Sequence, residues 1–164
     1  FGGSGVDRIY GDFIQAQLDS QYHGVDVIDG GDDGDFLFGM GGADTLYGGA
    51  GDDYIRGDDD GIAQGMQGGD FLFGGAGRDT IVGDGGDDYI DGGAEDDELD
   101  GGAGNDRYVV RAGDGRDTIY EERAGNTLVM IGGQLPHFAG AGARGKWASG
   151  EPAAAWLSVQ GTVA

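Results

Sequence analysis

The chain has 164 residues, of which 40 are glycine, and its 31 acidic residues against 9 Lys and Arg give a formal net charge of -22. Charge repulsion and backbone entropy oppose the folding of such a chain, so it would be disordered without an additional source of stability. Because cysteine is absent, disulfides and thiolate metal sites are excluded, which leaves a hard cation bound by oxygen atoms.

The acidic balance also restricts the partners. Nucleic acids and anionic lipid surfaces are themselves negatively charged, so we predict that the chain binds no nucleic acid. No stretch of the sequence approaches the roughly 18 apolar residues of a membrane span. No charged and apolar leader of a signal peptide opens it either. We therefore expect no transmembrane segment.

A nine-residue phrase, Gly-Gly-x-Gly-x-Asp-x-(Leu/Ile/Phe/Tyr)-x, repeats through most of the chain and is most complete at residues 48–56. A short fixed period means that each copy is one structural unit that stacks on its neighbours. Phe1 occupies the place of the ninth residue of a preceding copy, so we expect the chain to be a piece of a longer protein. The Asp at position six marks eleven copies: Asp7, Asp26, Asp35, Asp44, Asp53, Asp70, Asp79, Asp88, Asp97, Asp106 and Asp117.

In chain order, the copy of Asp7 is followed by an insert at residues 13–22, whose composition is compatible with about two helical turns. Copies then follow at intervals of nine up to a second insert, residues 59–66, which we predict to be a plain loop. A second unbroken run ends at Asp106, and two additional residues precede the copy of Asp117. We expect the inserts to leave from loops without disturbing the register of the stack.

Position eight is almost always Ile or Leu, while its two neighbours vary and are often polar. One apolar residue between two variable ones is typical of a very short strand with a single inward side chain. The glycine-rich remainder forms the turns, since glycine adopts the positive φ of tight bends. The eleven predicted core residues are Ile9, Ile28, Leu37, Leu46, Ile55, Leu72, Ile81, Ile90, Leu99, Tyr108 and Ile119.

Two copies therefore make one coil of 18 residues, and stacked coils make two parallel sheets about a thin core. The predicted fold class is all-β: a right-handed parallel β-roll, which is a solenoid of 18 residues per coil, with a C-terminal cap. Burial of one Ile or Leu per strand contributes about 2 kcal/mol. That does not offset roughly 1–2 kcal/mol of backbone entropy for every residue of the glycine-rich turns. The turns themselves must supply stability.

These copies resemble the RTX (repeats-in-toxin) haemolysin-type calcium-binding nonapeptide repeat, which forms the β-roll in the C-terminal part of larger secreted proteins. The resemblance covers residues 1 to about 120. It implies that each calcium ion lies between the turn of one copy and the turn two copies later, bound by position-six carboxylates and by glycine carbonyls. It pairs Asp7 with Asp35, Asp26 with Asp44, Asp35 with Asp53, Asp44 with Asp70, Asp53 with Asp79, Asp70 with Asp88, Asp79 with Asp97, Asp88 with Asp106 and Asp97 with Asp117, which allows nine ions at most.

Calcium takes six to eight oxygen ligands, and glycine turns expose backbone carbonyls that no side chain covers. The copies are not equivalent, because Asp33 and Glu95 replace the fourth-position glycine and the copy of Asp26 retains only Gly24. We expect weaker sites there. The carbonyls that the resemblance implies as ligands are those of Gly30, Gly39, Gly48, Gly51, Gly65, Gly68, Gly74, Gly77, Gly83, Gly86, Gly92, Gly101 and Gly104.

After residue 120 the pattern fades. Residues 121–131, with Leu128 as an apolar anchor, are predicted to cap the last coil and to protect its sheet edge from pairing with another chain. Two interpretations remain open for residues 132–164. They are either a remnant of the C-terminal secretion signal that type I exporters recognise in this family, or a flexible tail that packs loosely on the cap.

Other candidate sites in the sequence are explained without a specific functional role, or lack part of the motif that such a role requires. His23 and His137 are far apart and form no HExxH motif, so no zinc site is expected. The Asp-rich residues 58–60 lack the 12-residue loop and the terminal Glu of an EF-hand. Four aromatic residues flank core positions and should point outward, where they cover their own sheet or form a partner-binding patch. These are Phe36, Phe38, Phe71 and Phe73.

Three classes of function remain. The first, which we predict, is a non-catalytic calcium-binding module, unfolded in the cytosol and folded by the calcium outside the cell. The resemblance implies a secreted or cell-surface protein of bacterial type I export, with the secretion machinery and the upstream domains of a parent protein as partners. The second is the C-terminal part of a secreted protease, lipase or polysaccharide-modifying enzyme, although the chain itself lacks a catalytic constellation and is predicted not to be an enzyme. The third is an adhesin, for which the five Thr are too few to form an ice-binding array.

Overall fold

The computed structural model of the protein describes residues 1–11, 23–59, 63, 65–120, 127–131, 137–139 and 146–149. Within these residues all regular structure is strand, and no helix is long and apolar enough to cross a membrane. The helical turns predicted at 13–22 lie outside the described part. The strands are β1 (Gly3–Ser4), β2 (Arg8–Tyr10), β3 (Val27–Asp32), β4 (Phe36–Met40), β5 (Thr45–Ala50), β6 (Tyr54–Asp58), β7 (Phe71–Ala76), β8 (Thr80–Val82), β9 (Tyr89–Ala94), β10 (Glu98–Asp100), β11 (Arg107–Arg111), β12 (Thr118–Tyr120), β13 (Thr127–Ile131), β14 (His137–Ala139) and β15 (Lys146–Ser149).

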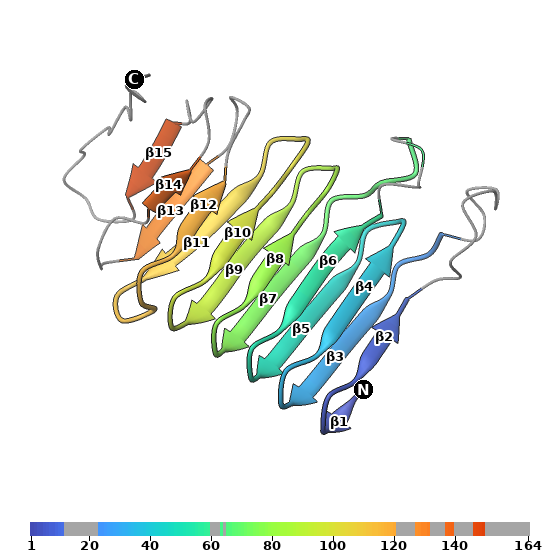
Figure 1. Ribbon diagram of the computed structural model, residues 1–164. Coiled ribbons are helices and arrows are strands. Elements are labelled where there is room, and N and C mark those ends of the chain that lie inside the picture. Colours follow the sequence, from blue (N-terminus) through green and yellow to red (C-terminus); the bar gives the residue numbers. More distant parts are fainter. Residues whose placement is uncertain are drawn as a thin grey trace.

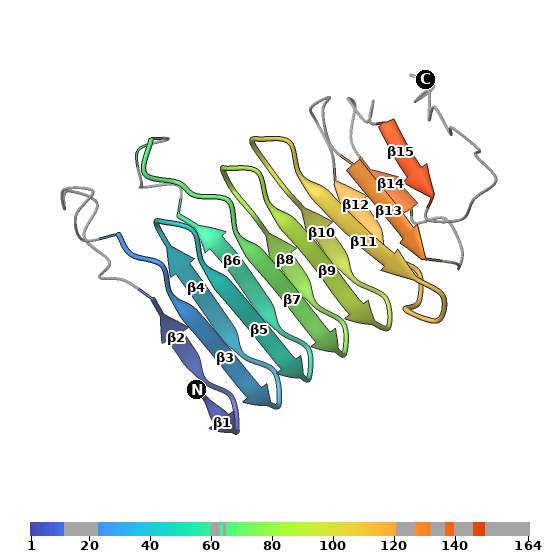
Figure 2. The same cartoon turned by 180° about the vertical axis from the view of Figure 1, so that it is seen from behind.

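The odd-numbered and the even-numbered strands form separate sheets. One sheet has the order β1-β3-β5-β7-β9-β11-β13-β15, and the other has the order β14-β12-β10-β8-β6-β4-β2. All neighbouring strands are parallel. The chain therefore passes from one sheet to the other at every turn, and its coils stack along one axis (Figure 1 and, from behind, Figure 2). This arrangement is a parallel β-roll, which confirms the predicted fold class.

The register shows how the stack accommodates the inserts. Where the repeat is unbroken, paired residues are 18 apart, as for Val27 and Thr45. Across the first insert, Arg8 pairs with Phe36, 28 residues later and ten more than one coil. Across the second, Thr45 pairs with Phe71, 26 residues later and eight more than one coil. These excesses equal the insert lengths of ten and eight, so both inserts leave the stack in register, as predicted.

Position eight supplies the core. Ten of the eleven predicted core residues are at most 3% exposed, and Ile9 packs against them. At β11 the core is thicker than the predicted single layer, because Val110 joins Tyr108 in it. The Gly101 N–H donates a hydrogen bond to the Tyr108 hydroxyl (2.7 Å), which satisfies the polar end of this large buried side chain.

Both sheets continue beyond residue 120. β13 pairs with β11, β14 with β12 and β15 with β13. The position-eight columns continue in register, with Leu128 opposite Tyr108 and Trp147 opposite Leu128. Each of these strands has an apolar residue between two variable ones, the pattern that predicted the earlier strands. Strands thus extend into residues 132–164, for which we expected either a secretion-signal remnant or a loosely packed tail.

Aromatic side chains lie on the outer faces of the sheets. Phe36 and Phe71 are 44% and 51% exposed, in agreement with the predicted outward orientation. Phe38 stacks on Tyr10 of the adjacent coil with ring centroids 4.8 Å apart. Phe73 makes an equivalent stack on the other sheet, at 5.0 Å. These contacts between consecutive coils indicate that the aromatic residues cover their own sheets.

Candidate metal centres

The position-six aspartates form two ladders. In each ladder, the Oδ1 atom of an aspartate accepts a hydrogen bond of 2.7–3.3 Å from the backbone N–H of the aspartate one coil earlier. The first ladder comprises Asp7, Asp35, Asp53, Asp79, Asp97 and Asp117, and the second ladder comprises Asp26, Asp44, Asp70, Asp88 and Asp106. The structure therefore brings together the two aspartates of each of the nine predicted pairs.

The other carboxylate oxygen of the ladder residues points into the protein. From Asp35 onward, every ladder residue is at most 3% exposed. A buried carboxylate oxygen without a partner is costly, and a bound cation removes that cost. Seven of the ladder residues have a buried Oδ2 atom that accepts no hydrogen bond: Asp7, Asp35, Asp53, Asp70, Asp79, Asp88 and Asp97.

Two kinds of oxygen converge in front of the first-position glycines, and we refer to this place as the gap. A methyl group added at Gly30 would lie 2.5 Å from Asp35 Oδ2 and 2.5 Å from the carbonyl oxygen of Gly48, one coil later. Carboxylate and carbonyl oxygens are the ligands that calcium prefers, so the residues present fit this ion. The same combination of a ladder Oδ2 and a glycine carbonyl recurs at Gly2, Gly11, Gly39, Gly48, Gly57, Gly74 and Gly83.

Most of the predicted carbonyls line these turns. The carbonyl oxygens at the gaps include those of Gly30, Gly39, Gly48, Gly74, Gly83, Gly92 and Gly101. Among the fourth-position glycines, the carbonyl of Gly51 lies against Gly77, that of Gly68 against Gly86 and that of Gly86 against Gly104. Gly65 lies apart from them, in the second insert, with no atom within 4 Å of the place of its missing side chain. The carbonyl of Gly57, which the sequence analysis left out, lines the gap at Gly39.

Burial raises the pKa values of several ladder carboxyl groups. Desolvation is the largest cause, the hydrogen bond from the neighbouring backbone N–H opposes it, and repulsion by nearby aspartates adds to it. From the ordinary value of 3.8, the pKa of Asp53 rises to about 6, that of Asp79 to about 7, and those of Asp88 and Asp97 to about 8. A cation in the gaps would stabilise the charged forms and remove this repulsion.

A test of the gaps is to fill one of them. We expect Gly30→Ala to destabilise the stack by about 1–3 kcal/mol, because its methyl group would collide with Asp35 Oδ2 and with the backbone of the next coil. Gly24→Ala is the matched control, since no atom lies within 4 Å of its Cβ position and neither glycine has a positive φ. The measurement is the urea midpoint of each variant in calcium. Equal losses in both variants would contradict this account of the gaps.

At position four, two turns keep a left-handed backbone without glycine. Asp33 and Glu95, at position four, have φ of 73° and 85°, whereas Gly51 at the same position has φ of 127°. Residues other than glycine adopt this region at a cost in free energy. The turns at Asp33 and Glu95 therefore retain a left-handed bend, and the weaker binding expected there stays a prediction.

A second set of hydrogen bonds lies outside the ladders, at exposed position-five aspartates to which the sequence analysis assigned no role. The carboxylates of these residues accept hydrogen bonds from backbone N–H groups one coil later. They thus clamp consecutive turns from the solvent side. The pairs are Asp52 with Arg78 (2.9 Å), Asp87 with Asn105 (2.8 Å) and Asp96 with Arg116 (2.8 Å).

The candidate metal positions of the described residues do not consist of side chains alone. There, no group of three or more His, Cys, Asp or Glu side chains is arranged to hold a metal ion. The gaps instead combine carboxylates with backbone carbonyls. His23 precedes β3 near one end of the stack, whereas His137 begins β14 at the other end, so the two histidines share no site.

Comparison with known proteins agrees with this geometry. A family model for four copies of the RTX calcium-binding nonapeptide repeat matches residues 1–13, 29–61, 57–90, 64–99 and 73–108. Together these matches cover residues 1–13 and 29–108, which is more than half of the chain. A comparison with curated proteins gives no match. The matching repeat is a structural calcium-binding unit and not a catalytic one, and the chain belongs to the family of RTX calcium-binding nonapeptide repeats.

Proposed function

We propose that the chain is a β-roll module that folds on binding several calcium ions outside the cell, and so supports the secretion and the stability of a larger exported protein. The observation that carries the proposal is the set of seven buried Oδ2 atoms that lack hydrogen-bond partners. At the gaps, ladder Oδ2 atoms lie beside backbone carbonyls of the next coil. Calcium supplies the charge and the oxygen coordination that such an arrangement requires.

The ladder aspartates and the glycine carbonyls at the gaps are the ligands in this proposal. Each pair of neighbours within a ladder holds one ion, which gives nine sites at most. Nine calcium ions would add 18 positive charges to the net charge of -22 and leave -4. The repulsion that opposes folding would then largely disappear, so that metal binding and folding form one equilibrium.

The proposal extends to the organisation of the chain. Residues 1–120 form the calcium-binding roll, residues 121–131 the cap, and residues 132–164 a C-terminal tail or an extension related to the secretion signal. Strands β13, β14 and β15 support a role of the last segments in covering the roll, since they continue both sheets. Upstream domains and the secretion machinery are the proposed partners, and the location is the outside of a bacterial cell.

A second candidate function is the partner-binding face of an adhesin. The observation that favours it is the exposure of Tyr47 and Phe71 on neighbouring strands, β5 and β7, of one sheet. The alternative of a parent enzyme concerns residues outside this chain.

Calorimetric titration of the 164-residue chain with calcium tests the proposal. We expect several ions per chain, with midpoints of about 0.1–1 mM, as in other extracellular modules. Asp88→Ala and Asp79→Ala should raise the midpoint more than Asp26→Ala. Asp79 and Asp88 are at most 2% exposed and lie within the unbroken run, whereas Asp26 is less buried and belongs to a glycine-poor copy. Equal effects would refute this ranking of the sites, and the absence of calcium binding would refute the function.

A further inference from the structure

Asp58 is a buried acid that the repeat does not explain. It is the last residue of β6 and stands at position two of its copy, where the phrase has glycine. It is 0% exposed, and neither of its carboxylate oxygens has a hydrogen-bond partner. Among the described residues it is the one carboxylate of which both oxygens are buried in this way. Within the described part of the chain, no hydrogen-bond donor therefore compensates its charge.

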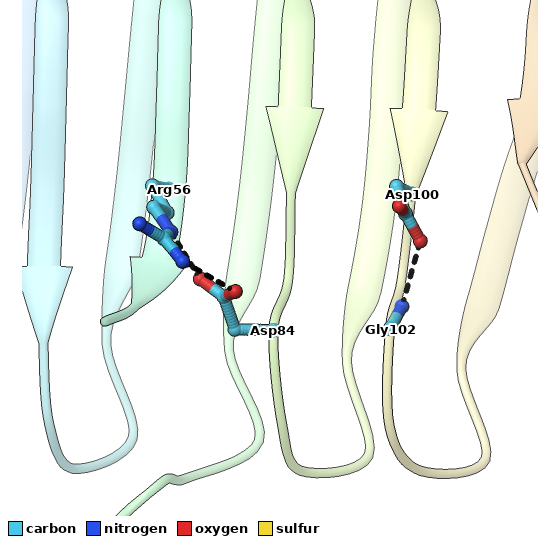
Figure 3. A network of polar contacts seen from close by, with 4 residues as sticks. All are labelled: Arg56, Asp84, Asp100 and Gly102. Carbon is cyan, nitrogen blue, oxygen red and sulfur yellow. Dashed lines mark hydrogen bonds and ion pairs between the residues drawn. The ribbon is translucent and has the colours of Figure 1, made fainter. Parts of the chain in front are cut away.

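The residues at position two of the neighbouring coils behave differently. Met40, the Cα partner of Asp58 one coil earlier, carries no charge. Asp84, one coil later, has φ of 70° and forms a bidentate ion pair with Arg56, with Nε–Oδ2 at 2.5 Å and Nη2–Oδ1 at 2.8 Å (Figure 3). At the next turn, Gly102 donates its N–H to Asp100 (3.0 Å), also in Figure 3. Asp58 has no positive φ, and its side chain is buried.

Asp58 lies beside the second ladder. The acids that act on it electrostatically are, in decreasing order, Asp70, Asp88, Asp84 and Asp44, and burial together with these neighbours raises its pKa to about 9. The ladder residues Asp70 and Asp88 each have a buried Oδ2 atom without a hydrogen-bond partner. Asp58 thus adds one more carboxylate to the second ladder, where neighbouring carboxylates already repel one another.

The gap nearest to Asp58 in sequence is the one at Gly57. A methyl group added there would meet Asp70 Oδ2 and would lie 2.9 Å from the carbonyl oxygen of Gly83. A carboxylate that follows directly in the chain, and that is enclosed with no other partner, can complete the oxygen shell of an ion in this gap. Affinity of calcium sites rises with the number of charged ligands.

We propose that Asp58 is a further metal ligand, which adds its carboxylate to the calcium position lined by Asp70 Oδ2 and the Gly83 carbonyl. This inference rests on the proposed function and goes beyond the repeat, because position two of the phrase carries no ligand. The position served by Asp58 is then the strongest calcium site of the second ladder. The high affinity of this site is specific to this chain, because Asp58 replaces the position-two glycine directly before the second insert.

The experiment compares calcium titrations of the wild-type chain with Asp58→Asn, Asp58→Gly and Glu98→Gln. Asp58→Asn keeps the shape of the side chain, and Asp58→Gly restores the residue of the repeat. Glu98→Gln removes one charge from an exposed residue of β10 and controls for net charge. We expect both Asp58 variants to lose about tenfold or more in affinity at the tightest class of sites, while Glu98→Gln stays within about twofold of the wild type.

The outcomes separate the two proposals. If the Asp58 variants titrate like Glu98→Gln while the wild type binds several ions, Asp58 is not a ligand and the proposed function stands. If Asp58→Asn stabilises the metal-free chain but leaves the calcium titration unchanged, Asp58 is a buried neutral acid, and the inference is again overturned. A wild-type chain that binds no calcium would refute both the proposed function and the role of Asp58. Circular dichroism in saturating calcium verifies that each variant folds.

Discussion

In a chelating buffer at neutral pH, we expect the 164-residue chain to be largely unfolded, and to gain β-structure cooperatively as calcium is added. The metal-free roll would bury nine ladder carboxylates at no more than 3% exposure, next to one another, in a chain of net charge -22. The core that opposes this repulsion is little more than one apolar side chain deep for each strand. Since every ladder residue joins two coils, the coils should fold together.

Far-UV circular dichroism during a calcium titration is the measurement. Magnesium at equal concentration is the control and should not replace calcium, because it requires a small octahedral shell and gives up its water reluctantly. A chain that is already folded in the chelator would contradict the coupling of folding to metal. A chain that folds equally well in magnesium would contradict the nature of the sites.

Acid should partly replace calcium. In the metal-free roll the carboxyl groups of Asp70 and Asp79 have pKa values of about 7, and those of Asp88 and Asp97 of about 8, against an ordinary value of 3.8. The folded chain therefore holds protons that the unfolded chain has released. The free energy of unfolding is increased in full below about pH 4, and the increase is lost as the pH rises to about 8.

The expected effect is large. A rise of one in the pKa of a carboxyl group changes the free energy of unfolding by about 1.4 kcal/mol between its protonated and its charged form. The pKa values of several ladder residues rise by more than that. The sum is comparable with the roughly 5–15 kcal/mol that stabilises an ordinary domain. We expect more β-structure in the chelated chain at pH 4.5 than at pH 7.5, and a smaller difference in Asp88→Asn. A chelated chain that loses structure on acidification would refute this balance of charges.

The fold could be predicted because it depends on the period and not on the surroundings of any one residue. A period of nine with one apolar position determines two short strands per coil, and position eight then forms the core. The pairing of Thr45 with Phe71 across the second insert follows from the same count. The nine neighbour pairs of the ladders were implied by the resemblance to the RTX repeat, which pairs each position-six aspartate with the one two copies later.

The features that the sequence did not reveal are those where the phrase fails. Trp147 pairs in register with Leu128, but its strand lacks the glycine and aspartate that marked the earlier copies. Gly57 and Asp58 precede the second insert, so counting did not assign them to a turn. Whether Asp58 points into the protein or to solvent depends on how the backbone leaves β6, and no periodicity encodes that path.

The ladders also have a direction. In both of them the earlier coil gives the N–H and the later coil gives the carboxylate, whereas the position-five clamps run the opposite way. A coil without its C-terminal neighbour keeps backbone donors with nothing to bind, and a coil without its N-terminal neighbour keeps carboxylate oxygens that water or an ion can serve. The C-terminal side of each coil therefore presents backbone N–H donors to which a further coil can bind. The N-terminal side presents carboxylate oxygens that can bind ions, so the two ends of the roll differ in what they can bind.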